Sequence, residues 1–499
     1  MPLRPTTDAV RLLGYSDLEG VYDRPAAVAR LAGFLTRRRD PATLVVGAGD
    51  NSALGVAATV SHNGDVDLST PTGRALAAPF YETVRPDAET FGNHDLDHGP
   101  AGARRLVREC PTTWLCDNVD HDPLTDAGVE PTRVFERAGS RVGVFGVTTA
   151  ELPSITPEAA GVSVSDPVAT ARRVSAQLRD RVDSVVGLSH CGVVDERVAA
   201  AADADVVLGG HRHERHADTH DGTLLVRTGG EGVVEATVDG EYTFHDVVDS
   251  VGDGSTETDE TTATETHERI RETYEHVRER LGLTDVVATV AEPIPRDTHT
   301  ITGGESRVGN FAADAYRAAT DAELGVMHNG SLRAGPQLAD DATSDATADG
   351  VIGDATDDGV IGDATGDVTD GVTSGDVISL SPFGNRLVTL SVTGARLRAG
   401  LRQLCATRDD HWFLSVSGGR VVWEPASEQF ARVSVAGEPL RDDRTYTVAT
   451  QEYLVDADVL PAFDAGQVVS FHGLQYDHLV EHARRGGLAV GVEGRVAFC

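Results

Sequence analysis

Short apolar runs alternate with amphipathic stretches along the first half of the chain. Four runs have the length and the β-branched content of buried strands, and each ends in glycine and polar residues. Stretches with helical spacing of apolar positions lie between them, for example 25–38. This alternation predicts an α/β arrangement, in which ligands bind beyond the carboxyl ends of the strands. The four runs are 43–50, 141–148, 184–192 and 204–213.

The pattern changes after 252–268, whose Gly, Ser, Thr, Asp and Glu content is typical of a linker. Apolar residues then recur at helical spacing from Ile270 to Leu281, which predicts a helix that joins two domains. Beyond it, helical patterns mix with β-rich runs. We therefore expect a first domain over 1–251, a linker and hinge helix over 252–284, and an α+β domain over 285–499.

One segment of the second domain has a different composition. Residues 345–353 (DATADGVIG) repeat as 354–362 (DATDDGVIG), and 340–376 contains no aromatic and no basic residue. Such a segment cannot bury enough apolar surface to offset the entropy lost on ordering. The Asp-Gly repeats also offer oxygen ligands for calcium, but a solvated insertion is the simpler interpretation. We predict a disordered, Asp/Gly-rich insertion over 340–376.

The charge balance limits the partners of the protein. The chain has 79 acidic and 43 basic residues, a formal net charge of −36, and no lysine. Such a surface repels nucleic acid and anionic membranes, so we expect neither as a partner. It is favourable in molar salt, where the Debye length falls to about 3 Å. The composition therefore predicts a halophilic, haloarchaeal-type protein, with an acidic protein of ordinary salt as the alternative.

No targeting or membrane segment is expected from the sequence. The chain lacks the apolar region of a signal peptide near its start, and it has no run of about 18 apolar residues. The 5 cysteines lack the spacing of a disulfide framework. We expect a soluble, cytoplasmic protein, and the sequence does not indicate its oligomeric state.

Five polar clusters lie at expected strand ends in the first half of the chain. Each cluster alone is common in surface loops, but together they gather carboxylate, imidazole and amide side chains. These hard oxygen and borderline nitrogen ligands suit divalent ions. They exceed what one ion needs, which predicts two ions that share a bridging carboxylate. The clusters are Asp17 with Glu19, Asp50, Asn93 with His94 and Asp97, His190, and His211 with His213.

The order of these clusters resembles the calcineurin-like metallophosphoesterase pattern of D-x-H, GD, GNH(E/D), H and GHxH. The second domain resembles the C-terminal domain of 5′-nucleotidases and 2′,3′-cyclic-nucleotide phosphodiesterases. This resemblance implies an α/β protein, with an N-terminal metallophosphoesterase β-sandwich flanked by helices and joined by a linker helix to an α+β substrate domain. The matching stretches of the second domain are 304–315, 328–335, 381–394, 413–420 and 446–454.

The resemblance also implies roles for the clustered residues. A water held between the two ions would attack phosphorus, His94 would stabilise charge on the phosphoryl oxygens, and Asp97 would orient the His94 ring. Asp95 and His98 receive no chemistry. The implied ligands are Asp17, Glu19, Asp50 and His213 for one ion, and Asp50, Asn93, His190 and His211 for the other, with Asp50 bridging.

Glu19 departs from the D-x-H motif, which has histidine at this position. Glutamate keeps a ligand, but it adds negative charge and makes the donor set harder. We therefore expect Mn²⁺ as the preferred ion, with Zn²⁺, Co²⁺, Fe²⁺ and Mg²⁺ as alternatives.

By resemblance, the second domain supplies the substrate contacts. Phe383 and Tyr453 match two rings that stack on either side of a nucleobase, which contributes about 1–3 kcal/mol per stack without reading base identity. Core packing is the alternative role for each ring, and Tyr453 stands where the family has Phe. Arg333 would bind an anionic group of the substrate, such as its phosphate.

Three further substrate-binding candidates match the family less well. Gly304 stands where the family often has arginine, and the nearest arginine is Arg307. His328 occupies the position of a family asparagine, and Asn329 follows it. A glycine-rich motif after Tyr453 is shortened here, although its Asp458 remains available for ribose hydroxyls.

The sequence therefore predicts a phosphoric ester hydrolase of the 5′-nucleotidase type. It would release phosphate from nucleoside 5′-monophosphates, with 2′,3′-cyclic nucleotides as further substrates. Two alternatives stay open, a metallophosphoesterase for a non-nucleotide ester and a non-catalytic nucleotide-binding protein.

Overall fold

The structure is a computed structural model, and contacts within it divide the chain into two compact units. We call them unit 1 (Met1–Val277) and unit 2 (Arg278–Cys499). None of the described helices is both long enough and apolar enough to cross a bilayer. The described residues are 10–52, 55–63, 75–120, 122–159, 161–247, 260–338, 371–405, 414–456 and 460–499.

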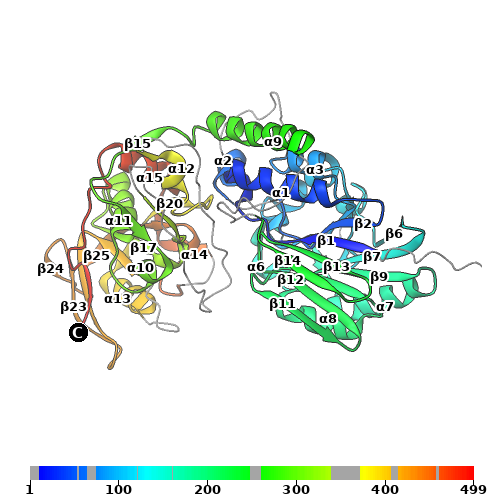
Figure 1. Ribbon diagram of the computed structural model, residues 1–499. Coiled ribbons are helices and arrows are strands. Elements are labelled where there is room, and N and C mark those ends of the chain that lie inside the picture. Colours follow the sequence, from blue (N-terminus) through cyan, green and yellow to red (C-terminus); the bar gives the residue numbers. More distant parts are fainter. Residues whose placement is uncertain are drawn as a thin grey trace, which may run out of the picture. The chain divides into compact units, whose positions relative to one another are not determined.

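Unit 1 contains two six-stranded sheets packed face to face, with helices on both outer faces (Figure 1). This confirms the predicted α/β class and the β-sandwich flanked by helices. The first sheet has the order β14 (Tyr242–His245), β13 (Val233–Thr237), β1 (Arg11–Tyr15), β2 (Thr43–Gly47), β3 (Ala88–Glu89) and β4 (Thr113–Trp114). The second has the order β11 (Arg215–His220), β12 (Thr223–Thr228), β10 (Val206–Gly209), β9 (Ser184–His190), β7 (Ser140–Thr148) and β6 (Thr132–Arg137).

Alternation of side chains along the strands builds three apolar layers. In β1, Leu12 faces the core between the sheets, whereas Leu13 and Tyr15 face the helices outside the first sheet. Each fully buried aliphatic side chain contributes about 1.5–3 kcal/mol relative to exposure. The outer face of the first sheet is covered by α1 (Pro25–Arg38), α3 (Ala78–Val84), α4 (Gly99–Glu109) and α9 (Glu260–Arg280), and that of the second by α7 (Pro167–Arg179) and α8 (Asp195–Ala201).

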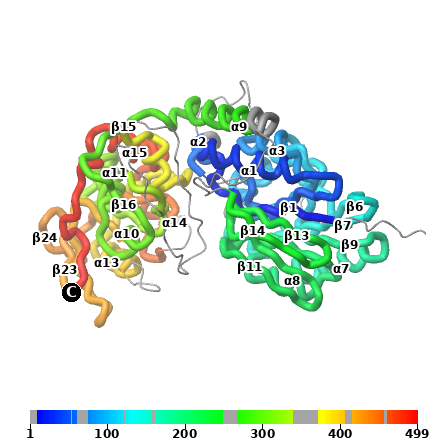
Figure 2. Tube along the Cα trace, viewed as in Figure 1, coloured from blue at the N-terminus to red at the C-terminus, as the bar shows by residue number. Residues whose placement is uncertain are grey.

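The predicted strands and the first helix are confirmed. The four apolar runs form β2, β7, β9 and β10, and α1 has the predicted bounds. Strand β13, far along the chain, pairs antiparallel with β1, with Arg11 opposite Thr237 (Figure 2). The first sheet is therefore completed by a segment that follows the strands of the second sheet in the sequence.

The helix expected to join the domains begins earlier than composition predicted. Helix α9 begins at Glu260, inside the stretch interpreted as a linker. Its Ile270 and Tyr274 are buried in the core of unit 1, and the Tyr274 hydroxyl donates a hydrogen bond to the Leu76 carbonyl at 3.0 Å. These contacts belong to unit 1, and a hinge role for α9 stays a prediction.

Unit 2 combines a five-stranded and a four-stranded sheet with helices, as the α+β prediction required. The first sheet has the order β21 (Leu414–Ser417), β17 (Leu324–His328), β25 (Thr445–Gln451), β20 (Arg386–Thr393) and β26 (Val468–Leu474). The second has the order β24 (Glu438–Pro439), β23 (Gln429–Val435), β22 (Gly419–Glu424) and β27 (Val496–Phe498). The main helices are α11 (Arg307–Thr320), α13 (Gly394–Cys405) and α15 (Gln475–Arg484).

The predicted insertion extends too far at its carboxyl end. Val372 and Thr373 form β19, which pairs with β15 (Val286–Ala288), and α12 (Ser374–Ile378) follows. Thr373 and Asp376 form a capping box, in which each side chain accepts a hydrogen bond from the backbone N–H of the other. Asp376 therefore belongs to the first turn of a helix and not to the acidic repeat. The rest of the predicted insertion, 340–370, lies outside the described residues.

Candidate active site

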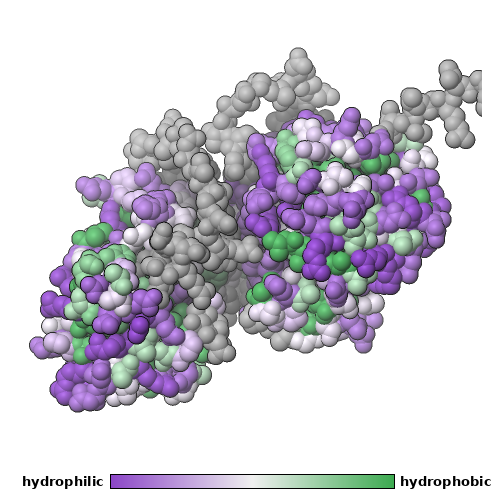
Figure 3. Space-filling model, turned by 90° about the horizontal axis from the view of Figure 1, so that it is seen from below, coloured by the Kyte–Doolittle hydropathy of each residue, from purple (hydrophilic) through white to green (hydrophobic). Residues whose placement is uncertain are grey.

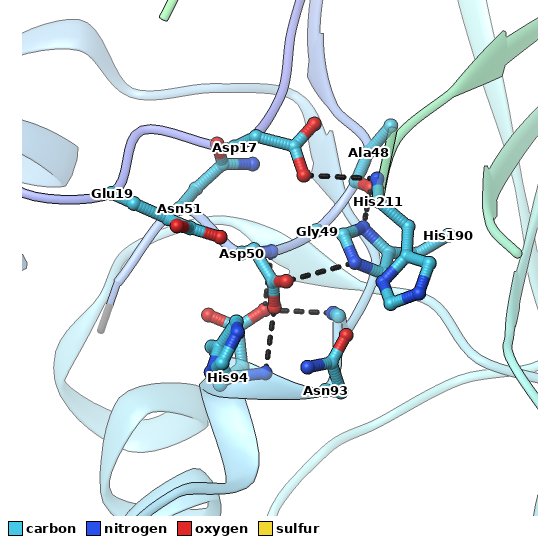
Figure 4. A network of polar contacts seen from close by, with 12 residues as sticks. Asp17, Glu19, Ala48, Gly49, Asp50, Asn51, Asn93, His94, His190 and His211 are labelled. Carbon is cyan, nitrogen blue, oxygen red and sulfur yellow. Dashed lines mark hydrogen bonds and ion pairs between the residues drawn. The ribbon is translucent and has the colours of Figure 1, made fainter. Parts of the chain in front are cut away.

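The candidate metal ligands come from loops at the carboxyl ends of strands in both sheets of unit 1. Strands β1, β2 and β3 are parallel neighbours, and so are β9 and β10. Their following loops meet at one edge of the sandwich, as open α/β sheets arrange their ligand sites (Figure 4). The residues are Asp17 and Glu19 after β1, Asp50 after β2, Asn93 and His94 after β3, His190 ending β9, and His211 and His213 after β10.

These side chains form overlapping groups whose ligand atoms lie within 4.8 Å of one another. Asp50 belongs to two groups, and Figure 4 shows its carboxylate between His190 and His94. The groups are Asp17, Glu19 and His213; Asp50, His190 and His211; and Glu19, Asp50 and His94. The structure therefore brings together the histidine and carboxylate ligands that the sequence predicted.

Two buried oxygen atoms support a ligand at this position. Asp17 Oδ2 and Asn93 Oδ1 are buried and have no hydrogen-bond partner among the described residues. Buried polar atoms are nearly always satisfied, because leaving one unpaired costs about 1–3 kcal/mol. Both are oxygen acceptors, which can act as ligands of a divalent cation.

Hydrogen bonds orient several of the candidate ligands. His190 Nδ1 lies 2.8 Å from the Ala48 carbonyl, which can only accept, so Nδ1 carries the proton and Nε2 faces Asp50 Oδ2 at 2.9 Å. Asp17 Oδ1 accepts a hydrogen bond from the His211 backbone N–H at 2.9 Å. Such outer contacts fix the tautomer and the direction of a ligating histidine.

Three candidate ligands have a left-handed backbone. Asp17 and Asp50 each have φ of 55°, and His211 has φ of 72°. Non-glycine residues seldom adopt this conformation, which costs of order 1 kcal/mol, although Asp and His adopt it more readily than most. Here it turns each loop sharply at or soon after a strand end, so that the side chains converge.

The site favours positive charge. Burial opposes protonation of His213, but Asp17 and Glu19, each 3.6 Å away, outweigh it and raise its pKa to about 11. In the same way burial is outweighed by Asp50, which raises the pKa of His190 to about 10. A centre that holds protons this firmly has the negative potential that attracts cations.

His94 and Asp97 form a pair beside this group. His94 Nδ1 lies 2.9 Å from Asp97 Oδ2, and both side chains are 28% exposed. Burial disfavours the His94 imidazolium, but Asp97 and Asp50 outweigh it and hold the pKa of His94 well above its usual value. The His94 backbone N–H also donates to Asp50 Oδ1 at 2.8 Å.

Asp95, to which the sequence assigned no chemistry, supports the loop of Asp50. Its carboxylate is buried and accepts hydrogen bonds from the backbone N–H groups of Asp50 at 2.9 Å and Gly92 at 2.8 Å. The Ser52 hydroxyl donates to its other oxygen. Burial and the charge of Asp50 raise the pKa of Asp95 to about 6.

Glu89 is a buried carboxylate that sequence reasoning missed. Its Oε2 accepts hydrogen bonds from the hydroxyls of Tyr15 and Tyr81 at 2.9 Å each, and its Oε1 accepts from Asn51 Nδ2 at 2.8 Å. Burial, together with the charge of Asp95, raises the pKa of Glu89 from 4.5 to about 8. No motif in the sequence marked this residue, because β3 consists of Ala88 and Glu89 alone.

We expect Glu89→Gln to preserve this network and Glu89→Leu to break it. Glutamine offers an oxygen to Asn51 and two N–H groups to the tyrosine oxygens. Leucine offers no acceptor, and each buried donor left unpaired costs about 1–3 kcal/mol. The folded pKa of Glu89 lies above its unfolded value, so folding takes up a proton. Its contribution to stability is therefore full below about pH 4.5 and is lost as pH rises through about 8.

Urea unfolding between about pH 5 and 9 measures this effect. The wild type should lose stability relative to Glu89→Gln as pH rises. Parallel stability curves for the two proteins would contradict the account.

In unit 2, three candidate substrate residues gather at one end of the five-stranded sheet. Phe383 precedes β20, Tyr453 follows β25, and Arg333 comes soon after β17. The strand pairing brings these ends together, and the Arg333 guanidinium lies 4.5 Å from the centroid of the Phe383 ring. Tyr453 is 41% exposed, so its ring is not core packing.

Two of the substrate candidates that match the family less well, Arg307 and Asn329, make hydrogen bonds within unit 2. Arg307 donates to the Val490 carbonyl at 3.0 Å. Asn329 is fully buried, where its amide donates to the Ile301 carbonyl and accepts from the Ser415 hydroxyl. Both side chains therefore hold the fold of unit 2. Asp458 lies outside the described residues.

One known family matches part of unit 2. Residues 286–465 match the family described as 5′-nucleotidase, C-terminal domain. This confirms the resemblance of the second domain over those residues.

Two relatives match the chain over very different lengths. The chain is 32% identical to an apyrase of Aedes aegypti over 148 residues, which are 28% of this chain and 26% of that protein. It is 23% identical over 478 residues to the trifunctional nucleotide phosphoesterase protein YfkN of Bacillus subtilis, covering 82% of this chain and 30% of that protein. The chain thus spans between a quarter and a third of the length of these two relatives.

A solved structure shares the whole fold. A 5′-nucleotidase precursor from Thermus thermophilus superposes with a TM-score of 0.67 at 20% identity, covering 98% of this chain and 99% of that one. At this identity the likeness shows the fold alone.

Proposed function

We propose that this protein hydrolyses nucleoside 5′-monophosphates to nucleoside and phosphate with two divalent ions, and that it also opens 2′,3′-cyclic nucleotides. The observation that carries the proposal is the convergence of carboxylate and imidazole ligands on Asp50, with the His94–Asp97 pair beside them. The names of the relatives and of the matched family support a nucleotide as substrate.

The ligands fit two ions that share one carboxylate. The ions would supply a water nucleophile of lowered pKa and positive charge next to the phosphoryl oxygens. The unpaired oxygens of Asp17 and Asn93 support this fit. We assign Asp17, Glu19, Asp50 and His213 to one ion, and Asp50, Asn93, His190 and His211 to the other, with Mn²⁺ as the expected metal and Zn²⁺, Co²⁺, Fe²⁺ and Mg²⁺ as alternatives.

His94 is proposed as the protonated group that stabilises the phosphoryl charge and donates a proton toward the leaving oxygen. Its contact with Asp97 at 2.9 Å keeps Nδ1 protonated and directs Nε2 away from that carboxylate. Cleavage of the P–O bond by water then gives the nucleoside hydroxyl and phosphate.

The nucleoside is proposed to bind unit 2. Phe383 and Tyr453 would stack on the base, and Arg333, held over the Phe383 ring, would bind an anionic oxygen of the substrate. Arg307 and Asn329 are left out of this assignment because their side chains bond within the fold of unit 2. A contact of Asp458 with ribose stays a prediction.

A panel of esters tests the substrate class. The chelated protein, in about 2–3 M KCl to screen the acidic surface, would receive each metal in turn together with AMP, 2′,3′-cyclic AMP, a sugar phosphate or an aryl phosphate. Metal-dependent phosphate release from AMP supports the proposal. Release from the sugar phosphate but not from AMP selects the non-nucleotide hydrolase, and binding without turnover of any ester selects the non-catalytic protein.

Phe383→Ala should raise KM for AMP and leave kcat nearly unchanged. Loss of one stack removes about 1–3 kcal/mol, which corresponds to a rise of about 5- to 150-fold. Phe471→Ala is the matched control, because Arg386 covers that exposed ring in the same way, at 4.2 Å. Equal effects of the two changes in steady-state kinetics would argue against a role for Phe383.

The acidic composition supports a halophilic protein as a further part of the proposal, and we propose a cytoplasmic location beside it. On the face shown in Figure 3, hydrophilic residues cover most of the described surface of both units. We expect the unfolding temperature to rise between about 0.2 and 2 M KCl, because screening relieves repulsion within a net charge of −36. A fall over this range, measured by calorimetry, would contradict the halophilic assignment.

A further inference from the structure

The segment that carries Phe383 has no regular structure of its own. Residues 381–385 lie between α12 and β20 and form neither helix nor strand. The Phe383 ring is partly exposed on this segment, and the Arg333 guanidinium lies 4.5 Å from its centroid. A ring on an irregular segment binds a base well only if the segment is already fixed, because ordering it on binding would reduce affinity. The contacts that fix this segment therefore bear on the affinity for the base.

Gln475 binds the segment at two points. The pairing of β20 with β26 places Arg386 opposite Leu474. Gln475, the first residue of α15, therefore lies beside Asn385, and its backbone N–H donates to the Asn385 carbonyl at 2.9 Å. The first N–H groups of a helix have no acceptor within the helix, so this bond satisfies the start of α15 as well. The side-chain Nε2 of Gln475 donates to the Phe383 carbonyl at 3.2 Å.

Tyr316 sets the orientation of the Gln475 amide. Helix α11, which carries this tyrosine, lies beside α15 (Figure 1). The Tyr316 hydroxyl donates a hydrogen bond to Gln475 Oε1, and both side chains are fully buried. If the amide turned over, its oxygen would face the Phe383 carbonyl, and two acceptors would meet in a buried site. The tyrosine therefore keeps the amide nitrogen directed at the segment that carries Phe383.

We propose that Gln475 is a positioning residue of the base site: its amide, oriented by Tyr316, fixes the segment so that the Phe383 ring is in place to stack on a base. The pair thereby favours esters that carry a base over esters that lack one. Gln475 lies beyond residues 286–465, which match the 5′-nucleotidase C-terminal domain family. This inference rests on the proposed nucleotidase function and specifies how its substrate is selected.

Gln475→Met tests the role, because methionine keeps the length of the side chain and removes the N–H donor. We expect KM for AMP to rise about 5- to 30-fold, as loss of one buried hydrogen bond implies, with kcat nearly unchanged. Ribose 5-phosphate offers the same phosphoester without a base, and its kinetic parameters should stay as in the wild type. Equal losses with the two substrates would indicate general damage and would overturn the proposal.

A double variant shows whether Gln475 acts through Phe383. Once the ring is removed, its position no longer matters. Phe383→Ala combined with Gln475→Met should therefore have the same KM for AMP as Phe383→Ala alone. Effects of the two substitutions that simply add would overturn the proposal.

Two further variants separate this role from a loss of stability. Gln467→Met is the matched control, because the Gln467 amide also bonds to backbone groups of a loop in unit 2, those of Ala462 and Asp464, and should leave both KM values unchanged. Tyr316→Phe removes only the hydroxyl that orients the amide and should raise KM for AMP by a smaller factor than Gln475→Met. It also serves as the test if Gln475→Met does not fold, as judged by circular dichroism. An unchanged KM for AMP in the folded variants would overturn the proposal.

Binding of adenosine to the full chain, measured by calorimetry, separates this inference from the proposed function. We expect the affinity to fall in Gln475→Met by the same factor by which KM rises. Weaker adenosine binding without phosphate release from AMP by the wild type rejects the nucleotidase function and leaves the positioning role standing. Release from AMP by the wild type, with equal adenosine affinity in the wild type and Gln475→Met, rejects the positioning role alone.

Discussion

Asp50→Asn should lower kcat for phosphate release by about 10³-fold or more and reduce the bound metal from two ions per chain to one or none. Asp50 is the carboxylate assigned to both proposed ions, and its oxygens belong to two of the ligand groups. Loss of one ion removes about 4 kcal/mol or more of transition-state stabilisation. This is the largest effect that the structure predicts for a single substitution.

The fold should survive this change. Asparagine keeps the oxygen that accepts from the His94 backbone N–H, and its amide can donate to a neutral His190 Nε2, 2.9 Å from the present oxygen. Asparagine also tolerates the left-handed backbone at this position. Asp321→Asn is the matched control, because Asp321 has φ of 53° at the end of α11, away from the ligands.

Mass spectrometry of bound metals and steady-state kinetics measure the result. Asp321→Asn should match the wild type in both. Full activity with two ions bound to Asp50→Asn would exclude the shared-carboxylate assignment.

His94→Ala should lower kcat by about 10²- to 10⁴-fold while the protein keeps both ions. His94 is assigned to the phosphoryl group rather than to a metal, and removal of a general acid or of a preorganised charge has effects of this size. KM should change much less, since the base contacts are assigned to unit 2.

Two neighbouring residues separate this role from a structural one. Asp97→Asn should cause a smaller loss of kcat and alter the pH profile, because it removes the charge that holds His94 protonated at 2.9 Å. His98→Ala, four residues along the same loop, should behave as the wild type. Equal losses in His94→Ala and His98→Ala would indicate damage to the loop and not to catalysis.

The positions of the candidate metal ligands were predictable because strand ends are marked in the sequence. An apolar run followed by glycine and a polar residue identifies both the strand and the edge of the sheet where its loop lies. This holds for Asp50 after β2 and for His190 at the end of β9. Parallel neighbours then bring such loops together whatever their separation along the chain.

The buried residues around these candidate ligands could not be predicted in the same way. Glu89 binds Tyr15 and Tyr81, whose proximity depends on the packing of α3 against β1 and β3. Asn329 matched a family motif by position, yet its amide is used inside unit 2 by Ile301 and Ser415. A motif identifies a residue type at a spacing, but only packing decides which partners it meets.

Element boundaries failed where local side-chain bonding overrode composition. Thr373 and Asp376 continue the acidic, glycine-rich character of the predicted insertion, but they form a capping box that begins α12. In α9 the helix starts at Glu260 although the stretch reads as a linker. The content of Glu, Thr and Ala in this stretch did not distinguish a helix from a linker.

The central claim is that two metal ions on the edge of unit 1 drive hydrolysis of nucleotides. Its most direct test is phosphate release from AMP by chelated protein in about 2–3 M KCl, followed while Mn²⁺ is added in measured equivalents. The account predicts no release from the chelated protein and full release only as the second ion binds. Release that is independent of added metal, or no release at any metal content, would contradict it.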